Sequence, residues 1–317
     1  MKKAYITGPT GAIGRALIDK LNSEGVHVTV MVRPDSQRAD NLISEGILKN
    51  AEIIKCDLKD LKKLDVAASD EDSVFYHLGW MGTSGAARMD MKLQLMNAEY
   101  TIDAVELAAK LKCRRFVGVG SQAEYGTYDV KLTNGTPCNP ENGYGIAKLM
   151  AGQMSRIRAH QLGLEHVWTR VLSVYGVGDN ENTLIASLVS NLMKGREVHC
   201  TKGEQIWNYI SSKDAVEYLY RLGDADNADG MTYCIAGPKA RPLKEYMEMV
   251  REAVTEANAG NECPSIIYDR PYPEGQVMHL DADISETIKV TGYSPAIDFE
   301  EGIRELIQNY SNPKGIK

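Results

Sequence analysis

Residues 4–14 read AYITGPTGAIG, and this stretch decides the fold. The apolar run at 4–7 predicts a strand that leads into a turn with three glycines, and apolar residues spaced over 13–21 predict the helix that follows. Glycines allow a tight turn and let the backbone approach a pyrophosphate, which then lies at the positive N-terminus of the helix. The stretch therefore predicts a dinucleotide-binding turn. Its candidate cofactor contacts are Thr7, Gly8, Thr10, Gly11, Ala12, Ile13 and Gly14.

Strand-like and helical patterns alternate through the first half of the chain. Further strands are predicted at 26–32, 51–55, 73–78, 115–120 and 165–171, and long helices at 89–111 and 144–162. This alternation is typical of a parallel, doubly wound α/β sheet of the Rossmann type. In the less regular second half, helices are expected at 182–194, 213–222, 243–258 and 299–310, and short strands near 197–199, 207–210, 232–235 and 265–268.

The composition excludes several classes of protein. The 317 residues are 43% hydrophobic and 25% charged, which excludes a disordered, collagen-like or coiled-coil chain. The net charge of −7 and the lack of a basic block argue against nucleic acid as a partner. No apolar run is long enough for a membrane span, and the start MKKAYITG has no signal-peptide core, so we expect a cytoplasmic protein. Six dispersed cysteines fit reduced thiols, and no metal site is predicted.

The end of the second predicted strand bears on the choice between NAD and NADP. The sequence there reads Val32-Arg33-Pro34, with no acid before Asp35. A carboxylate at this position would hold the ribose hydroxyls of NAD, whereas a guanidinium can meet a 2′-phosphate with two parallel hydrogen bonds. Arg33 therefore favours NADP, with NAD possible, and a solvated loop arginine is the plain alternative.

A serine and a Tyr-x-x-x-Lys pair carry the predicted chemistry. Ser121 ends the fifth predicted strand, and Tyr144 and Lys148 open a helix that begins 23 residues later. Tyrosine ordinarily has a pKa of about 10, and a lysine one helical turn later is expected to lower it. A second pair of this spacing, Tyr209 and Lys213, is assigned to a short strand of the other lobe, because only Tyr144 follows a strand that ends in serine.

Together these residues resemble the extended short-chain dehydrogenases/reductases, the NAD(P)-dependent nucleotide-sugar epimerase/dehydratase/reductase family. The spacing of Gly8, Gly11 and Gly14 is typical of that superfamily, and the resemblance covers nearly the whole chain. Supporting motifs are FYHLG at 75–79, Asn97, RVLSVYG at 170–176, RPYPEG at 270–275 and TGYSP at 291–295.

The resemblance implies roles for the candidate residues. Ser121 would hold the reacting oxygen, Tyr144 would exchange the proton, and Lys148 would bind the nicotinamide ribose. Asp57 would contact the adenine amino group. The other implied cofactor contacts are Leu58, Leu78, Gly79, Trp80 and Leu172. The implied substrate contacts are Met81, Thr83, Gln122, Ser173, Trp207 and Arg270, the last as a phosphate ligand.

Three departures from the family's pattern narrow the expected reaction. Gln122 and Ala123 stand where dehydratases carry an acid pair, which disfavours a 4,6-dehydratase. Trp207 and Asn208 replace an arginine–acid pair, and Trp207 either stacks on a base or packs in the core. Ser173 replaces the usual asparagine near the sixth strand.

We expect an NADP-dependent oxidoreductase that reduces the 4-keto group of a nucleotide-diphosphate (6-deoxy)sugar. The nicotinamide would supply the hydride and Tyr144 the proton. An NAD(P)-dependent nucleotide-sugar 4-epimerase with the same serine, tyrosine and lysine is one alternative. A non-catalytic NADP-binding sensor is an alternative of another class.

The chain is expected to divide into two parts. Residues 1–175, with about 205–235, would form a NAD(P)-binding Rossmann domain. Residues 176–204 and 236–317 would form a smaller C-terminal α/β lobe that binds the substrate. Such a lobe would lie at the carboxyl edge of the sheet, where doubly wound folds bind ligands.

A homodimer is also expected from the resemblance. The two long helices at 89–111 and 144–162 would form a four-helix contact with those of a second copy. Apolar positions that would serve this contact are Leu95, Ile102, Leu149 and Ile157. The alternative is that these helices only cover the sheet.

Overall fold

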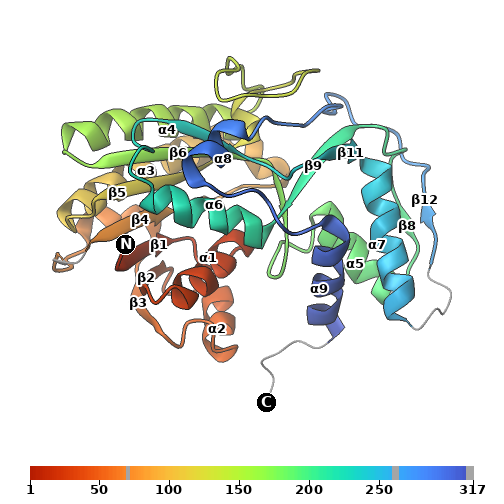
Figure 1. Ribbon diagram of the computed structural model, residues 1–317, viewed down its shortest axis with the longest axis horizontal. Coiled ribbons are helices and arrows are strands. Elements are labelled where there is room, and N and C mark those ends of the chain that lie inside the picture. Colours follow the sequence, from red (N-terminus) through yellow and green to blue (C-terminus); the bar gives the residue numbers. More distant parts are fainter. Residues whose placement is uncertain (69–71, 259–263, 312–317) are drawn as a thin grey trace.

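A seven-stranded parallel sheet forms the centre of the molecule (Figure 1). The computed structural model describes residues 1–68, 72–258 and 264–311. The strands are β1 (Lys3–Thr7), β2 (His27–Val32), β3 (Ala51–Lys55), β4 (Ser73–His77), β5 (Arg115–Ser121), β6 (Glu165–Val171) and β10 (Thr232–Ile235). Their order is β10-β6-β5-β4-β1-β2-β3, and each neighbouring pair is parallel. The chain moves outward from β1 in both directions, so the predicted doubly wound fold is confirmed.

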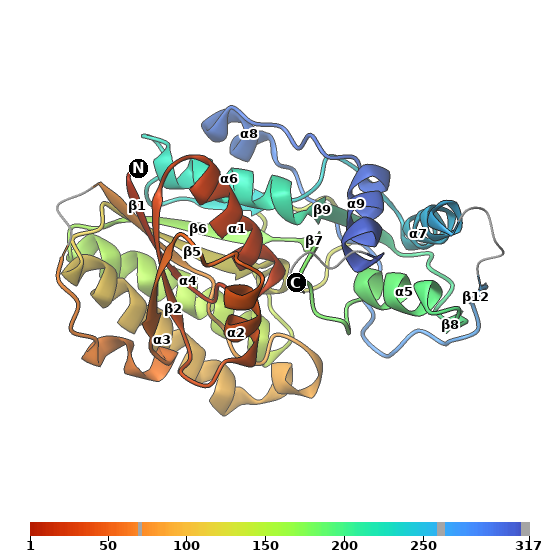
Figure 2. The ribbon, with the colours of Figure 1, turned by 90° about the horizontal axis from the view of Figure 1, so that it is seen from below.

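Helices cover both faces of this sheet (Figure 2). α1 (Ala12–Ser23) and α6 (Ser212–Asp224) pack together on one face, and α3 (Met91–Lys110) and α4 (Gly143–Gln161) pack together on the other. The sequence of β2, HVTVMV, shows why, since five of its six residues are buried. Strands that are covered on both faces read as apolar runs rather than as alternating patterns.

A smaller lobe lies at one end of the sheet (Figures 1 and 2). Its helices are α5 (Leu184–Met193), α7 (Leu243–Ala257) and α9 (Phe299–Ser311), whose apolar faces form a second core. Its strands are β7 (Ser173–Tyr175), β8 (Val198–His199), β9 (Ile206–Ser211), β11 (Ala240–Pro242) and β12 (Ile266–Ile267). They form a three-stranded sheet, β11-β9-β7, and a two-stranded sheet, β12-β8. Tyr209 therefore lies on a short strand, as predicted, and that strand joins the three-stranded sheet of the lobe although the expected division of the chain grouped 205–235 with the Rossmann domain.

Four short elements lie outside the predicted set: α2 (Gln37–Ser44), β7, β11 and α8 (Ser285–Thr291). α2 has only eight residues and buries only Ala39 and Leu42, so its apolar face spans too few turns for periodicity to detect it. β7 and β11 have three residues each. The predicted helices and strands are present, with bounds that shift by at most two residues.

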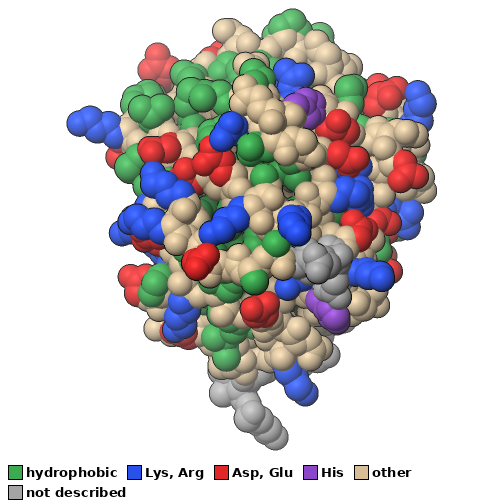
Figure 3. Space-filling model, turned by 90° about the vertical axis from the view of Figure 1, so that its left-hand side faces the viewer, with side chains coloured by type: hydrophobic (Ala, Val, Ile, Leu, Met, Phe, Trp, Pro, Cys, Tyr) green, Lys and Arg blue, Asp and Glu red, His purple; other side chains and the backbone are tan. Residues whose placement is uncertain are grey.

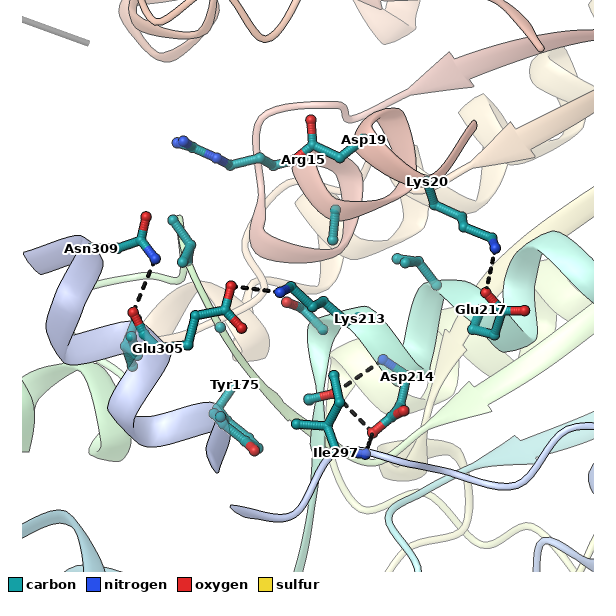
Figure 4. A pocket seen from close by; sticks show the side chains of 18 of the residues that line it. Arg15, Asp19, Lys20, Tyr175, Lys213, Asp214, Glu217, Ile297, Glu305 and Asn309 are labelled. Atoms are coloured by element: carbon teal, nitrogen blue, oxygen red, sulfur yellow. Dashed lines mark hydrogen bonds and ion pairs between the residues drawn. The ribbon is translucent and has the colours of Figure 1, made fainter. Parts of the chain in front are cut away.

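Asp214, in the first turn of α6, fastens the C-terminal segment to the helix layer of the sheet (Figure 4). Its carboxylate accepts hydrogen bonds from the Tyr293 hydroxyl at 2.5 Å and from the N–H groups of Ala296 at 3.0 Å and Ile297 at 3.2 Å. A cavity of about 450 Å³ lies beside it, between α1, α6 and α9, and charged side chains of all three helices face it. The hydrogen bonds of Asp214 thus join the segment before α9 to α6, which covers the central sheet.

Surface charge, cysteines and possible metal or membrane sites bear on the expectations from the sequence. On the face shown in Figure 3, basic and acidic side chains are interspersed. Cys56, Cys113, Cys138, Cys200 and Cys234 are free, and Cys263 lies outside the described residues. Within the described ranges, no helix is long and apolar enough to cross a bilayer, and no group of three His, Cys, Asp or Glu side chains is placed to hold a metal ion.

Candidate active site

The glycine turn between β1 and α1 has the close packing that its motif predicts. α1 begins after Gly11, and no side chain caps its first turn. A Cβ on Gly14 would lie 2.5 Å from the Gly8 carbonyl oxygen, so only glycine lets the helix pack this closely on the turn. The N–H groups of the first helical turn are therefore available to a pyrophosphate, whose negative charge the helix dipole favours.

A buried histidine holds the end of β1. Thr7 Oγ1 lies 2.8 Å from His77 Nδ1 and accepts a hydrogen bond from the Gly79 N–H at 3.3 Å. Thr101 Oγ1 lies 3.3 Å from the other ring nitrogen. Burial lowers the pKa of His77 to about 3, so the ring is neutral and acts through hydrogen bonds. Thr7 and Gly79 are thereby fixed next to one another beside the glycine turn.

A cavity of about 560 Å³ opens beside the glycine turn. Of the predicted cofactor and substrate contacts, it is lined by Gly8, Thr10, Arg33, Leu58, Gly79, Trp80 and Met81. The lining residues that were not predicted are Pro9, Met31, Val32, Ser36, Arg38, Cys56, Gly82 and Leu93. Its volume and its place at the carboxyl ends of the strands suit a dinucleotide.

Two arginines line this cavity after the end of β2. Arg33 follows the strand directly and Arg38 lies in the first turn of α2, and both are exposed. Ser36, which also lines the cavity, accepts a hydrogen bond from the Ala39 N–H at 3.3 Å and so starts the helix between the two arginines. In the described part of the chain, neither guanidinium lies within ion-pairing distance of a carboxylate. Sequence reasoning misses Arg38, because α2 itself has no clear pattern.

The three predicted catalytic residues meet where β5 ends and α4 begins. Ser121 ends β5, where its hydroxyl accepts a hydrogen bond from the Ala123 N–H at 3.2 Å, and it lies close enough to Tyr144 to lower the pKa of that phenol. Tyr144 lies in the first turn of α4, because the Asn142 side chain accepts a hydrogen bond from the Gly145 N–H at 2.9 Å and starts the helix there. A Cβ on Gly145 would lie 2.2 Å from the Ala123 carbonyl oxygen, so this glycine lets α4 approach the strand end.

Lys148 lies one helical turn after Tyr144 and is 4% exposed. Its Nζ donates a hydrogen bond to the Val119 carbonyl oxygen at 2.6 Å and lies 3.9 Å from the centroid of the Trp80 ring. Burial lowers the pKa of Lys148 to about 7, although the negative charge of Glu124 opposes this. Burial therefore disfavours the charged form of this amine, whereas the face of the Trp80 ring beside it favours that form.

The pKa of Tyr144 is set by several neighbours. Burial raises this pKa above its usual value, while the hydrogen bond of Ser121 and the positive charge of Arg88 lower it. Arg88 Cζ lies 4.3 Å from the Tyr144 ring centroid, and Lys148 Nζ lies 6.0 Å from it. The pKa of Tyr144 is thus raised overall by burial, and Ser121 and Arg88 are the groups that lower it; a contribution from Lys148 stays a prediction.

A buried carboxylate lies directly beneath Ser121, the predicted catalytic serine. Glu124 accepts hydrogen bonds from the Ser121 N–H at 2.8 Å, from Trp168 Nε1 at 3.0 Å and from Arg170 Nε at 2.9 Å. Burial raises its pKa, and Arg170 opposes that shift. Glu124 thus holds the strand end that carries Ser121. Sequence reasoning assigns it no role, although an acid three residues after a serine is the sign of a capping box.

Replacing Glu124 by alanine should destabilise the fold strongly. It would leave the buried Arg170 guanidinium and the Ser121 N–H without their acceptor. Breaking one side of a buried ion pair costs about 3–5 kcal/mol of unfolding free energy, which urea denaturation measures. The control is Glu286→Ala, at an exposed helix position, which should stay within about 0.5 kcal/mol. A loss below about 1 kcal/mol for Glu124→Ala would contradict a structural role for the pair.

The loop after β4 is held by two buried amides of α3. Asn97 Oδ1 accepts from the Met81 N–H and its Nδ2 donates to the Met81 carbonyl oxygen, both at 2.9 Å. Gln94 Oε1 accepts from Trp80 Nε1 at 2.8 Å. The Trp80 ring meets the Tyr144 ring edge-on, with centroids 6.1 Å apart. The structure therefore brings Trp80 to the catalytic residues as well as to the cavity.

The predicted substrate contacts of the C-terminal half lie in two places. Trp207 Nε1 donates a hydrogen bond to Ser173 Oγ at 2.8 Å. The half-buried Trp207 ring packs against apolar clusters of the lobe, which favours the interpretation as a core residue. Asn208 exchanges two hydrogen bonds with the backbone of Gly237 and is buried. Arg270 is exposed beyond β12 and is not among the residues that line the cavity at the glycine turn.

The remaining predicted contacts also have local partners. Asp57 accepts a backbone hydrogen bond at 3.2 Å that caps the short 3-10 helix η1 (Leu58–Lys63). Leu78 and Leu172 pack against apolar clusters of the core. Thr83 is exposed, and Gln122 is half-buried in the short 3-10 helix η3 (Gln122–Glu124). Ligand contacts for these residues stay predictions.

A family model matches most of this architecture. The model of the NAD dependent epimerase/dehydratase family matches residues 4–236, from β1 through the end of β10. The chain belongs to this family. The family's enzymes act on nucleotide sugars as epimerases, dehydratases and reductases, in agreement with the predicted resemblance.

Several relatives are similar to this chain over three quarters of its length or more. CDP-abequose synthase of Salmonella typhimurium is 22% identical over 306 residues, 96% of each chain. dTDP-6-deoxy-L-talose 4-dehydrogenase (NAD(+)) of Aggregatibacter actinomycetemcomitans is 26% identical over 246 residues, 77% of this chain and 87% of that protein. The structure of UDP-N-acetylglucosamine 4-epimerase from Methanobrevibacter ruminantium, in complex with UDP-N-acetylmuramic acid, has a TM-score of 0.85 at 21% identity and covers 98% of this chain and 99% of its own. The epimerase shares the fold.

Proposed function

We propose that this member of the family is an NADP-dependent reductase of a 4-keto nucleotide-diphosphate sugar, in the first place a 6-deoxysugar. The proposal rests on two guanidinium groups that line the cavity after β2 and form no ion pair with a carboxylate of the described residues. They belong to Arg33 and Arg38. A 2′-phosphate would find two cations and the N-terminus of α2 there, whereas a carboxylate that would hold the NAD ribose is missing from β2 and from residues 33 and 34.

The residues at the glycine turn fit such a dinucleotide. The uncapped N-terminus of α1 suits its pyrophosphate, and Trp80 and Met81 supply an apolar wall to the cavity. NADPH, when bound, supplies the hydride. A relative whose name includes NAD(+), the talose 4-dehydrogenase, shows that both cofactors must be tested.

The catalytic residues supply the proton and hold the oxygen. Ser121 would hydrogen-bond the carbonyl oxygen of the sugar, and Tyr144 would donate its phenolic proton to that oxygen as it gains negative charge. Lys148, one turn along α4, would bind the ribose hydroxyls of the cofactor. Glu124 keeps Ser121 in place through the backbone hydrogen bond at 2.8 Å.

Two observations bear on the competing reactions. Gln122 and Ala123 follow Ser121 where an acid–base pair would serve a 4,6-dehydratase, and neither side chain can move a proton at neutral pH. A 4-epimerase with the same serine, tyrosine and lysine remains the second candidate, which the fold shared with the solved epimerase supports. An enzyme purified with tightly held NAD would favour that second candidate over the reductase.

We also propose that the protein is a homodimer through α3 and α4. Leu95 on α3 and Ile157 on α4 are 60% and 56% exposed, which is unusual for large apolar side chains on two adjacent helices. Of the other predicted contact positions, Ile102 and Leu149 are half-buried. Further exposed apolar side chains of the same helix pair are Met91, Met96, Ile146 and Met154. Burial of this surface against a second copy would remove it from water.

Sedimentation should therefore show a species of twice the 35.0 kDa chain mass at micromolar concentration. The double substitution Leu95→Glu and Ile157→Glu should convert it to a monomer, because four charges would have to be buried in the contact. Ile43→Glu is the matched control, since Ile43 is 45% exposed on α2, away from this helix pair. A wild-type species at the monomer mass would contradict the dimer.

A further inference from the structure

Arg88 covers the ring of Tyr144 from the loop that follows β4. It lies in the short 3-10 helix η2 (Gly85–Met89), and its Cζ is 4.3 Å from the ring centroid. Its Nη1 donates a hydrogen bond to the Thr83 carbonyl oxygen at 3.3 Å. Among the described residues, no carboxylate forms an ion pair with it. A half-buried guanidinium over an aromatic face has an attractive interaction with the ring, which becomes stronger if the phenol loses its proton.

A buried amide fixes the position of this loop. Gln94 on α3 is 1% exposed, and its Nε2 donates hydrogen bonds to the carbonyl oxygens of Gly82 and Ala87, both at 2.9 Å. Gly82 precedes η2 on the chain, and Ala87 lies within η2 directly before Arg88. The guanidinium is therefore held at Tyr144 by a loop that is itself tied to the core.

Three other polar groups face Tyr144, each from a different element. Ser121 at the end of β5 lowers the pKa of Tyr144, Glu124 in η3 contributes a buried negative charge that raises it, and Lys148 lies one turn further along α4. Lys148 Nζ lies 6.0 Å from the ring centroid and donates to a backbone carbonyl. A guanidinium is protonated at all accessible pH values. Among the described residues, Arg88 is the cation nearest to the Tyr144 ring, at 4.3 Å from its centroid against 6.0 Å for Lys148.

We propose that Arg88 is a positioning residue of the catalytic site, whose fixed charge over the Tyr144 ring stabilises the phenolate form of that tyrosine. The proposal rests on the proposed function of Tyr144 as the proton donor. When the O–H bond of Tyr144 breaks and its proton bonds to the sugar oxygen, the phenol oxygen keeps the electron pair and becomes negative. Arg88 would balance that charge until the phenolate takes a proton from water.

The test places 3,5-difluorotyrosine at position 144 and follows its ionisation by ¹⁹F NMR. The fluorinated phenol ionises near neutral pH, so both variants titrate while the protein is folded. We expect Arg88→Gln to raise the apparent pKa at position 144 by about 1 unit, because a cation within 4–6 Å lowers the pKa of an acid by about that amount or more. Arg88→Lys should restore most of the difference. Arg196→Gln, an exposed arginine of the C-terminal lobe, is the control and should change nothing.

A shift smaller than about half a unit in Arg88→Gln would overturn the proposal. The measurement needs neither substrate nor cofactor, so it is independent of whether the protein reduces a keto sugar. If the titration shifts as expected but no reductase activity is found, the proposed function fails while the influence of Arg88 on Tyr144 stands. If activity is found and the titration does not shift, the proposed function stands and the role of Arg88 fails.

Discussion

Tyr144→Phe should lower the rate of keto-sugar reduction by about 10²–10⁴-fold, the usual contribution of a general acid. The substitution removes only the phenolic oxygen, and the ring would keep its contacts with Trp80 and Arg88. The proton donor would be lost while the hydride path stays intact. Steady-state rates with NADPH and a keto sugar measure the effect, and circular dichroism checks the fold.

The chain offers a matched control for this substitution. Tyr209 belongs to the second Tyr-x-x-x-Lys pair, and it packs among Tyr175, Tyr246 and Phe299 in the core of the C-terminal lobe. Tyr209→Phe should leave the reaction rate within about threefold of wild type, because it touches no reacting group. If Tyr144→Phe retained more than about a tenth of the activity, Tyr144 would not be the general acid.

Arg33→Ala should weaken the binding of NADPH by about 10–100-fold and leave the binding of NADH nearly unchanged. A charged hydrogen bond contributes about 1.5–3 kcal/mol, which corresponds to that range of affinity. Arg38→Ala should have the same direction of effect, because both guanidinium groups line the cavity at the end of β2. Fluorescence titration of both cofactors with wild type and variants measures the change.

NADH serves as the internal control for this pair of variants, since it lacks the 2′-phosphate. A loss in the double variant that differs from the sum of the two single losses would show that the two arginines act on the same group. Equal affinity of the wild type for NADPH and NADH would contradict the NADP assignment and would shift the balance toward the NAD-retaining epimerase.

The sequence predicts the central sheet well because most of its strands are buried on both faces. The apolar runs of β1 and β2 and the glycines of the turn leave little choice of structure, and the strand bounds agree closely. Short or amphipathically weak elements escape prediction. α2 buries only Ala39 and Leu42, so both the helix and Arg38 within it were beyond a periodicity argument.

The candidate site is only partly visible in the sequence. Spacing and strand context identify Ser121, Tyr144 and Lys148, which the structure brings together. Spacing cannot report that Glu124 turns back beneath Ser121, or that Arg88 stacks on Tyr144, because both contacts depend on how separate elements pack. The same limit applies to the pKa of Tyr144, which burial raises despite the lysine one turn away.

The most direct test of the reductase assignment is the balance of cofactor and sugar in one reaction. The purified protein would be mixed with NADPH, deuterated at the transferable position of the nicotinamide, and with a panel of nucleotide-diphosphate 4-keto-6-deoxyhexoses. NADPH loss would be followed by absorbance, and the product by NMR. For a reductase, we expect that one NADPH is oxidised for each sugar reduced and that the deuterium is bound at C4 of the product. Epimerisation of a nucleotide hexose by the same preparation, with no NADPH consumed by any of the keto sugars, would contradict it.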